Sequence, residues 1–298
     1  NSLGVMTHFG RRDPKGAIEH YERAVELQER LSIEQPDQPL FRSDLVSTWN
    51  NLAIAYRMTE QYQLARDTYG RVIDVRTEML TSTPKDLDNV VQLASCLRNV
   101  GRLYQAWGQR EETLNWYEQS IELLETLKER TGPDPRIRFQ LARVWWDRAE
   151  SLLALGRPAE AVVAWQKTHG YEDGDERDYV AMQLARTRAL AGDHRTAADE
   201  AAKLLESGRL DSETIYDGGR TLALCRAALE DDEELTAEQR NALSGDYLDR
   251  TMAALAAARE ADWFAEPEHV GQLDEESDFD SVRNEARFST FRSGLRTK

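Results

Sequence analysis

The chain has 298 residues, 31% of them charged, and a formal net charge of −16. No apolar run approaches the roughly 20 residues that a helix needs to cross a bilayer, so we expect no membrane insertion in this chain. Cys96 and Cys225 are the only cysteines and form no CxxC spacing, which argues against a disulfide framework and a cysteine-based metal site. Few cysteines are compatible with export too; we expect a cytoplasmic location.

The negative charge is concentrated near the C-terminus. Residues 211–280 carry 20 acidic and 5 basic side chains, whereas residues 281–298 have a balance of +4. A region this acidic repels phosphate backbones, so nucleic acid is a poor candidate partner. We interpret the region as a solvated surface that keeps the protein soluble; a dock for a basic partner is the alternative.

A shortened helix pair is predicted at the start of the chain. The tetrad Asn1–Gly4 echoes the tetrad Asn50–Ala53, and Ala17 and Tyr21 mark one face of a following helix. Asn1 would then lie partway along a first helix whose N-terminal half is absent. We therefore expect a truncated first repeat and a chain that is the tail of something longer.

A complete copy of the pair follows within residues 46–73. One helix face is formed by residues at i, i+3, i+4 and i+7, namely Trp49, Leu52, Ala53 and Tyr56. After a turn around Glu60, the second helix alternates small and large residues, as Ala65, Tyr69 and Val72. This alternation lets two antiparallel helices approach closely. It matches the tetratricopeptide (TPR) pattern of W-x2-L-G-x2-Y followed by A-x3-F.

Further copies follow at a long period. The small residues at the closest helix approach are spaced by 49, 48, 48 and 36 residues, in the order Gly4, Ala53, Gly101, Ala149 and Ala185. The three spacings of 48 or 49 are much longer than the 34 residues of a standard TPR, because the second helices and the proline-containing linkers are long. Gly108, Gly156 and Gly192 stand where each pair reverses direction.

The pattern changes from about Asp211. A helix over residues 215–229 precedes the acidic insert Glu230–Glu234, and Thr236 has the character of a cap that opens a further helix. The tail contains aromatic residues that we expect to cover the end of the array, Trp263, Phe264, Phe279, Phe288 and Phe291. We therefore predict an all-α, right-handed TPR-type α-solenoid of about five helical pairs (residues 1–210). A divergent helical repeat, the acidic insert and a capping segment would follow (residues 211–298).

Several stretches resemble the long-period TPR arrays that follow certain bacterial serine/threonine protein kinase domains. Near the N-terminus these are Leu27–Leu31, Gln35–Asp37, Phe41–Leu45 and Trp49–Ala53. Tyr216–Leu224, Ala253–Asp262 and His269–Phe288 resemble the ending of the same proteins. The resemblance spans nearly the whole chain and is weakest at residues 166–212. It implies that the chain is the C-terminal part of a larger signalling kinase, although similar arrays also stand alone.

Catalytic motifs are not found in the sequence. His194–Thr196 and Asp278–Asp280 resemble kinase loops only superficially, since they lack the required Gly and Asn and lie in helical and tail contexts. The five histidines are scattered, without a P-loop, nucleophile elbow or HExxH motif. We expect no enzymatic activity, no cofactor and no metal site in this chain.

In a TPR superhelix, the first helix of each pair lines the concave wall. The helical register places on this wall Asn50, Asn51, Ile54 and Arg57, then Arg98, Asn99, Arg102 and Gln105, then Arg143, Trp146, Asp147 and Glu150, and finally Met182, Gln183 and Arg186. Asn amides can bind a peptide backbone, and Arg can hold a carboxylate. Similar residues occupy the groove of peptide-binding TPR families, including kinesin light chains and carboxylate-clamp cochaperones. That resemblance favours Asn50, Asn51, Arg57, Arg98, Asn99, Arg102 and Arg143 as the binding residues.

The sequence therefore predicts a non-catalytic protein-interaction scaffold that binds an extended peptide or protein, and an acidic or carboxylate end is the feature we expect it to recognise. The structural alternative is that the Asn side chains satisfy neighbouring helices and the Arg side chains pair with adjacent carboxylates. Self-association through the truncated N-terminal repeat is a second functional hypothesis, and a stand-alone TPR adaptor without a kinase is a third.

Overall fold

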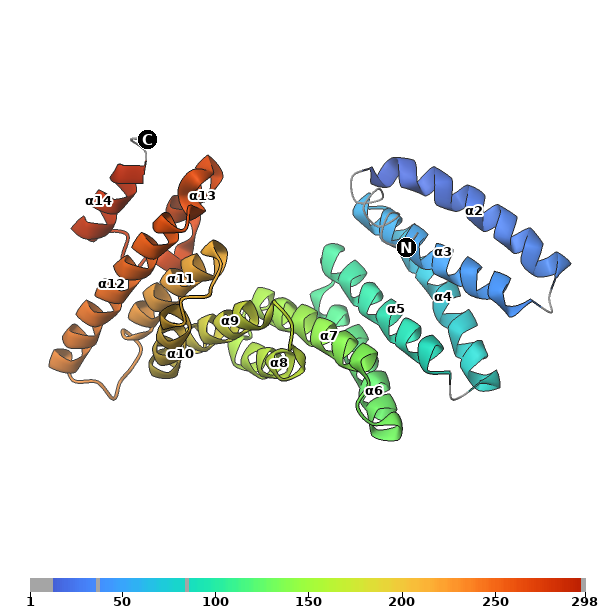
Figure 1. Ribbon diagram of the computed structural model, residues 1–298, viewed down its shortest axis with the longest axis horizontal. Coiled ribbons are helices and arrows are strands. Elements are labelled where there is room, and N and C mark those ends of the chain that lie inside the picture. The colour runs from blue at the N-terminus through green and yellow to red at the C-terminus, as the bar shows by residue number, and fades with distance from the viewer. Residues whose placement is uncertain (1–12, 36–37, 84–85, 296–298) are drawn as a thin grey trace. The chain divides into compact units, whose positions relative to one another are not determined.

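The computed structural model describes residues 13–35, 38–83 and 86–295, and all regular structure in these ranges is helical (Figure 1). The chain divides into two compact units, unit 1 (Asn1–Ser151) and unit 2 (Leu152–Lys298). The predicted truncation at Asn1–Gly4, and with it the self-association surface, lies outside the described residues. The predicted boundary between residues 210 and 211 separates regular repeats from a divergent region, and it stays a prediction.

Unit 1 is built from long antiparallel helices: α2 (Pro14–Glu34), α3 (Pro39–Met58), α4 (Tyr62–Ser82), α5 (Leu87–Ala106), α6 (Arg110–Thr131) and most of α7 (Pro135–Ala154). Helices that follow one another from α2 to α6 pack side by side. The first helices of the predicted pairs are α3, α5 and α7, and the second helices are α2, α4 and α6. These lengths explain the long period, because the second helices α4 and α6 have 21 and 22 residues.

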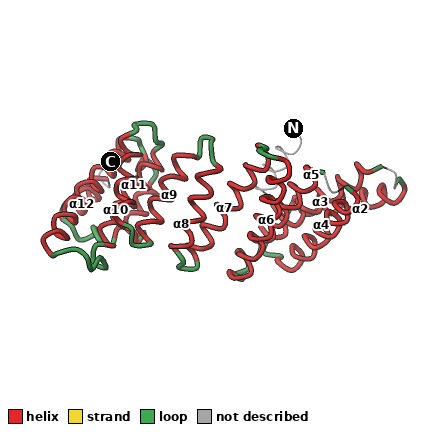
Figure 2. Tube along the Cα trace, turned by 90° about the horizontal axis from the view of Figure 1, so that it is seen from below, coloured by secondary structure: helices red, strands yellow, loops and turns green. Residues whose placement is uncertain are grey.

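Unit 2 contains four shorter helices, α8 (Pro158–Tyr171), α9 (Arg177–Leu190), α10 (His194–Glu206) and α11 (Ser212–Ala228), and then the longer α12 (Ala237–Glu260). The chain then forms η1 (Trp263–Ala265), α13 (Pro267–Glu275), η2 (Ser277–Phe279) and α14 (Ala286–Leu295). In Figure 2 the elements of each unit are joined mostly by short loops. The all-α array with a divergent helical C-terminal cap is therefore as predicted.

Local signals explain where the helices begin and reverse. Thr236 caps α12 with a full capping box, in which its hydroxyl accepts from the backbone of Gln239 and the Gln239 side chain accepts in return. Gly108 has a positive φ of 80° at the turn between α5 and α6. Glu60 takes the equivalent place between α3 and α4, at a φ of 62° that non-glycine residues adopt at a cost.

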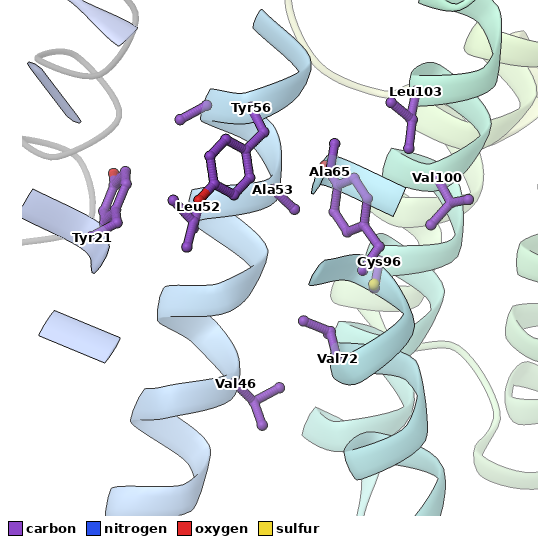
Figure 3. Packing of buried hydrophobic residues seen from close by; sticks show 12 residues of the cluster. Tyr21, Val46, Leu52, Ala53, Tyr56, Ala65, Val72, Cys96, Val100 and Leu103 are labelled. Carbon is purple, nitrogen blue, oxygen red and sulfur yellow. The ribbon is translucent and has the colours of Figure 1, made fainter. Parts of the chain in front are cut away.

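The core of unit 1 follows the predicted alternation of small and large residues. Ala53 of α3 and Ala65 of α4 are fully buried in one cluster with Val100 of α5 (Figure 3). Tyr69 of α4 is a buried member of the same cluster. Trp49 packs against the same cluster but is only partly buried. Burial raises the pKa of Tyr56 to about 12, and its hydroxyl donates to Glu22 of α2 at 2.6 Å. The cluster ties α2, α3, α4 and α5 together.

Close approach between α5 and α6 depends on a glycine. A Cβ added at Gly101 would overlap the ring of Tyr117, which is 0% exposed. Gly101→Ala is therefore expected to lower the free energy of unfolding by about 1–3 kcal/mol, despite the better helix propensity of Ala. Gly70→Ala, at a helical site where a Cβ meets nothing within 4 Å, should instead raise it by about 0.5–1 kcal/mol. Urea unfolding followed by circular dichroism compares the two; equal shifts would contradict the helix register.

Candidate partner-binding surface

The predicted binding residues lie on the three first helices of unit 1, and we call this surface the first-helix wall. It comprises Asn50, Asn51 and Arg57 of α3, Arg98, Asn99 and Arg102 of α5, and Arg143 of α7. Two side-chain contacts join the helices: Asn99 Nδ2 donates to Asn50 Oδ1 at 3.4 Å, and Arg98 Nε donates to Asp147 Oδ2 at 2.6 Å. The wall is therefore a continuous polar surface across α3, α5 and α7.

Some of these residues are already used within the fold. The side chains of Arg98 and Asp147 are only 14% and 11% exposed, so their ion pair mainly fixes α5 against α7. Asn50 and Asn99 bond each other, and Arg57 is partly buried near the enclosed hydroxyl of Tyr69. For Arg98, Asn50 and Asn99 these contacts fit the alternative in which polar groups satisfy neighbouring helices.

Arg102 is more exposed than Arg98 and lies farther from the carboxylate of Asp147. Its side chain is 42% exposed, and its Nε lies 3.9 Å from Asp147 Oδ2, an oxygen that already accepts the shorter bond from Arg98. Asn51, which lies on α3, is half-buried and makes no side-chain hydrogen bond within the described residues. These two side chains have the donor capacity that a bound segment needs.

An aromatic strip continues the wall on α7. The guanidinium of Arg143 lies over the rings of Phe139 and Trp146, 5.8 Å from each centroid. The side chain of Phe139 is 58% exposed, an unusual exposure for an aromatic residue on a helix. Arg143 is therefore a stacked side chain, and the strip offers apolar surface beside the charged part of the wall.

Unit 2 contains an arginine cluster that binds a segment of the chain itself. Arg186 of α9 donates from Nη2 to Asp278 Oδ2 at 2.7 Å, and Arg220 of α11 donates from Nε to the same oxygen at 3.0 Å. Arg220 also contacts Glu276 at 2.9 Å and Asp217 at 2.8 Å. Although burial lowers it, these carboxylates together raise the pKa of Arg220 above its ordinary value. The η2 segment is thus held by its carboxylates against the first helices α9 and α11.

The sequence does not predict Asp278 and Arg220 as binding residues, because they lie in the region after Asp211 that diverges from the repeat pattern. Arg220 nevertheless follows Arg186 by 34 residues, the standard TPR spacing, and this signal could have identified it. Of the two segments with superficial kinase likeness, one contains Asp278. The other contains His194, which is 2% exposed and bonded to Asp232 and Tyr247 at 2.9 Å each. Both segments therefore contain a side chain that is bonded within the fold.

Other kinds of site receive no support from the described part of the chain. No group of three or more His, Cys, Asp or Glu side chains is arranged to hold a metal ion there. In the same residues, no helix is both long enough and apolar enough to span a membrane.

Comparisons with known proteins agree with this architecture. Residues 93–127, which cover most of α5 and α6, match a family model described as tetratricopeptide repeat. The structure resembles BtubC (BKLC) from P. vanneervenii with a TM-score of 0.55 and 17% identity, over 83% of this chain and 92% of that chain. It also resembles a putative kinesin light chain with TPR-like repeats from Podosopora anserina, with a TM-score of 0.51 and 19% identity, over 71% and 95%. No curated protein sequence gives a significant match. The chain thus has the fold of a TPR-type array, with its family match in α5 and α6.

Proposed function

We propose that this chain is a non-catalytic scaffold that binds an extended acidic segment of a partner protein across the first-helix wall of unit 1. The TPR-type fold supports protein interaction in general. We infer the position of the binding site and the acidic character of the partner segment from the arrangement of arginines in each unit.

The observation that carries the proposal is a repeated register position. Each of three first helices has an arginine directly after the small residue that faces its partner helix, and these arginines are Arg102, Arg186 and Arg220. In unit 2 the last two hold the Asp278 carboxylate. In unit 1 Arg102 has the same position but no close carboxylate of its own. The chain therefore provides an example of how such a wall binds an acidic segment, and Arg102 has room to do the same.

A peptide from the chain itself is a defined probe of this surface. We expect a capped peptide of residues 274–280 to bind with micromolar affinity, about −8 kcal/mol. Arg102→Ala should weaken it at least tenfold, a loss of about 1.4 kcal/mol, because a charge-assisted hydrogen bond is removed. Isothermal titration calorimetry measures both values.

Two further variants sharpen this test. Arg66→Ala removes an arginine that pairs with its neighbour Asp67 on α4, and should leave the affinity unchanged. Arg98→Ala is a poor choice by itself, since it also breaks the internal pair with Asp147. Equal affinities of the wild type and Arg102→Ala would refute the proposed site.

The larger protein is a separate part of the proposal. On the strength of the resemblance, we infer that the array follows a serine/threonine kinase domain and presents substrates or signals to it. The reading frame that encodes the residues before Asn1 tests this inference. A frame with no glycine-rich loop, catalytic loop or DFG-type metal loop would instead favour a stand-alone adaptor.

A further inference from the structure

A pocket lies on the side of α5 opposite the first-helix wall, and its aromatic and charged lining has no role in the proposed function. It has a volume of about 450 Å³ and is lined by α4, α5 and α6. Val100 and Tyr104 line it, each two residues after Arg98 and Arg102, which is about 200° around the helix. The pocket therefore faces away from the first-helix wall, and we call it the outer pocket.

Aromatic rings form one side of the outer pocket. Tyr104 of α5 and Trp116 of α6 are stacked, with ring centroids 5.9 Å apart and planes 23° apart, and both are half-buried. Tyr104 also lies 6.1 Å from Trp107, which stacks on Tyr62 at 5.8 Å. Neighbouring rings hold Tyr104 and Trp116 in place, so they present a rigid π surface to whatever enters the pocket.

Four charged side chains surround these rings, and three of them have partners. Arg66 donates to Asp67 at 2.9 Å. Arg71 lies over the ring of Trp49 of α3 at 5.9 Å and 3.9 Å from Glu29 of α2, so it has partners on both helices. Asp74 is exposed and makes no hydrogen bond or ion pair within the described residues. The pocket therefore combines an aromatic surface with one available carboxylate.

We propose that the outer pocket binds the side chain of an arginine from a partner protein. A guanidinium can stack its flat face on an aromatic ring while its edge donates hydrogen bonds to a carboxylate, which Tyr104, Trp116 and Asp74 supply together. An aliphatic side chain would leave the carboxylate unused, and an acidic one would be repelled by it. Unit 1 thus has a second binding site that faces away from the wall and prefers the opposite charge.

The test uses the full chain at physiological salt and capped five-residue peptides, Gly-Gly-Xaa-Gly-Gly, in which Xaa is Arg, Lys, Leu or Glu. The indole N–H signal of Trp116, identified by its loss in Trp116→Phe, reports binding in two-dimensional NMR titrations. We expect the dissociation constant of the Arg peptide to be at least fivefold lower than that of the Leu peptide, with no saturable shift from the Glu peptide. Equal binding of the Leu peptide would overturn the proposal, and equal binding of the Lys peptide would overturn its assignment to a guanidinium.

Two matched variants distinguish binding in the outer pocket from non-specific attraction of a basic peptide to an acidic protein. Asp74→Asn and Asp67→Asn remove the same charge from positions two turns apart on α4, but Asp67 is paired with Arg66, whereas Asp74 is available to a ligand. We expect Asp74→Asn to weaken the Arg peptide at least fivefold and Asp67→Asn to change its affinity less than twofold. Equal effects of the two variants would show that the net charge, rather than the pocket, attracts the peptide. Because the variants do not touch Arg102, this result is independent of the proposed wall site.

Discussion

Trp165→Ala is expected to lower the free energy of unfolding by about 3–5 kcal/mol, the usual loss for a large aromatic residue in a core. Trp165 lies on α8, is 2% exposed and is among the largest fully enclosed side chains of the described residues. Its removal leaves a cavity that the neighbouring helices can fill only by shifting toward it. Chemical denaturation followed by circular dichroism measures the change.

Val163→Ala is the matched control, because Val163 lies on the same helix and is 50% exposed. Its effect should stay within about 0.5 kcal/mol, as for most surface substitutions. Trp49, on the predicted packing face of α3, is only partly buried, so Trp49→Ala should cost less than Trp165→Ala. An unchanged unfolding midpoint in Trp165→Ala would mean that the register of α8 is wrong.

Asp278→Ala is expected to cost about 3–5 kcal/mol, because it leaves two arginines without their shared carboxylate in a largely buried place. The side chain of Asp278 is 8% exposed, and those of Arg186 and Arg220 are 17% and 21% exposed. Beside it, Phe279 is fully buried against Tyr216, with ring centroids 5.7 Å apart. Loss of the ion pairs should therefore also loosen the packing of the C-terminal segment. Hydrogen exchange of residues 276–282 would show this local opening.

Asp280→Ala is the control for this prediction. Asp280 is two residues away, its side chain is 68% exposed, and it pairs with Arg283 within the same turn. Exposed pairs of this kind contribute at most about 1 kcal/mol. If Asp278→Ala and Asp280→Ala had the same small effect, the cluster around Arg220 would not hold the tail.

Much of the architecture could be predicted from the sequence because local signals repeat. Gly108, Gly156 and Gly192 all have positive φ at the predicted turns, and Thr236 caps a helix as expected. The small residues Ala53 and Gly101 lie at close contacts between helices, since only a small side chain fits there. Such features depend on residues within one or two turns, which a sequence pattern records directly.

The proposed binding residues could be assigned to particular helices from the sequence, but they could not be ranked. Arg98 and Arg102 are four residues apart, so they share a helix face, and the sequence gives no reason to prefer one. The structure separates them, because Asp147, which is 49 residues after Arg98, lies close to Arg98 and neutralises it. The availability of a charged side chain therefore depends on contacts between repeats, which the local pattern does not contain.

The sequence by itself determined the helical pairs, their long period and the face of each helix that packs, because these follow from periodicity and side-chain size. Only the tertiary structure decided which polar groups are already satisfied. It brought Asp278 to Arg186, 92 residues earlier, and left Arg102 and Asp74 exposed. The physical reason is that helix formation is local, whereas the desolvation and pairing of charges depend on residues that meet only after the helices have packed.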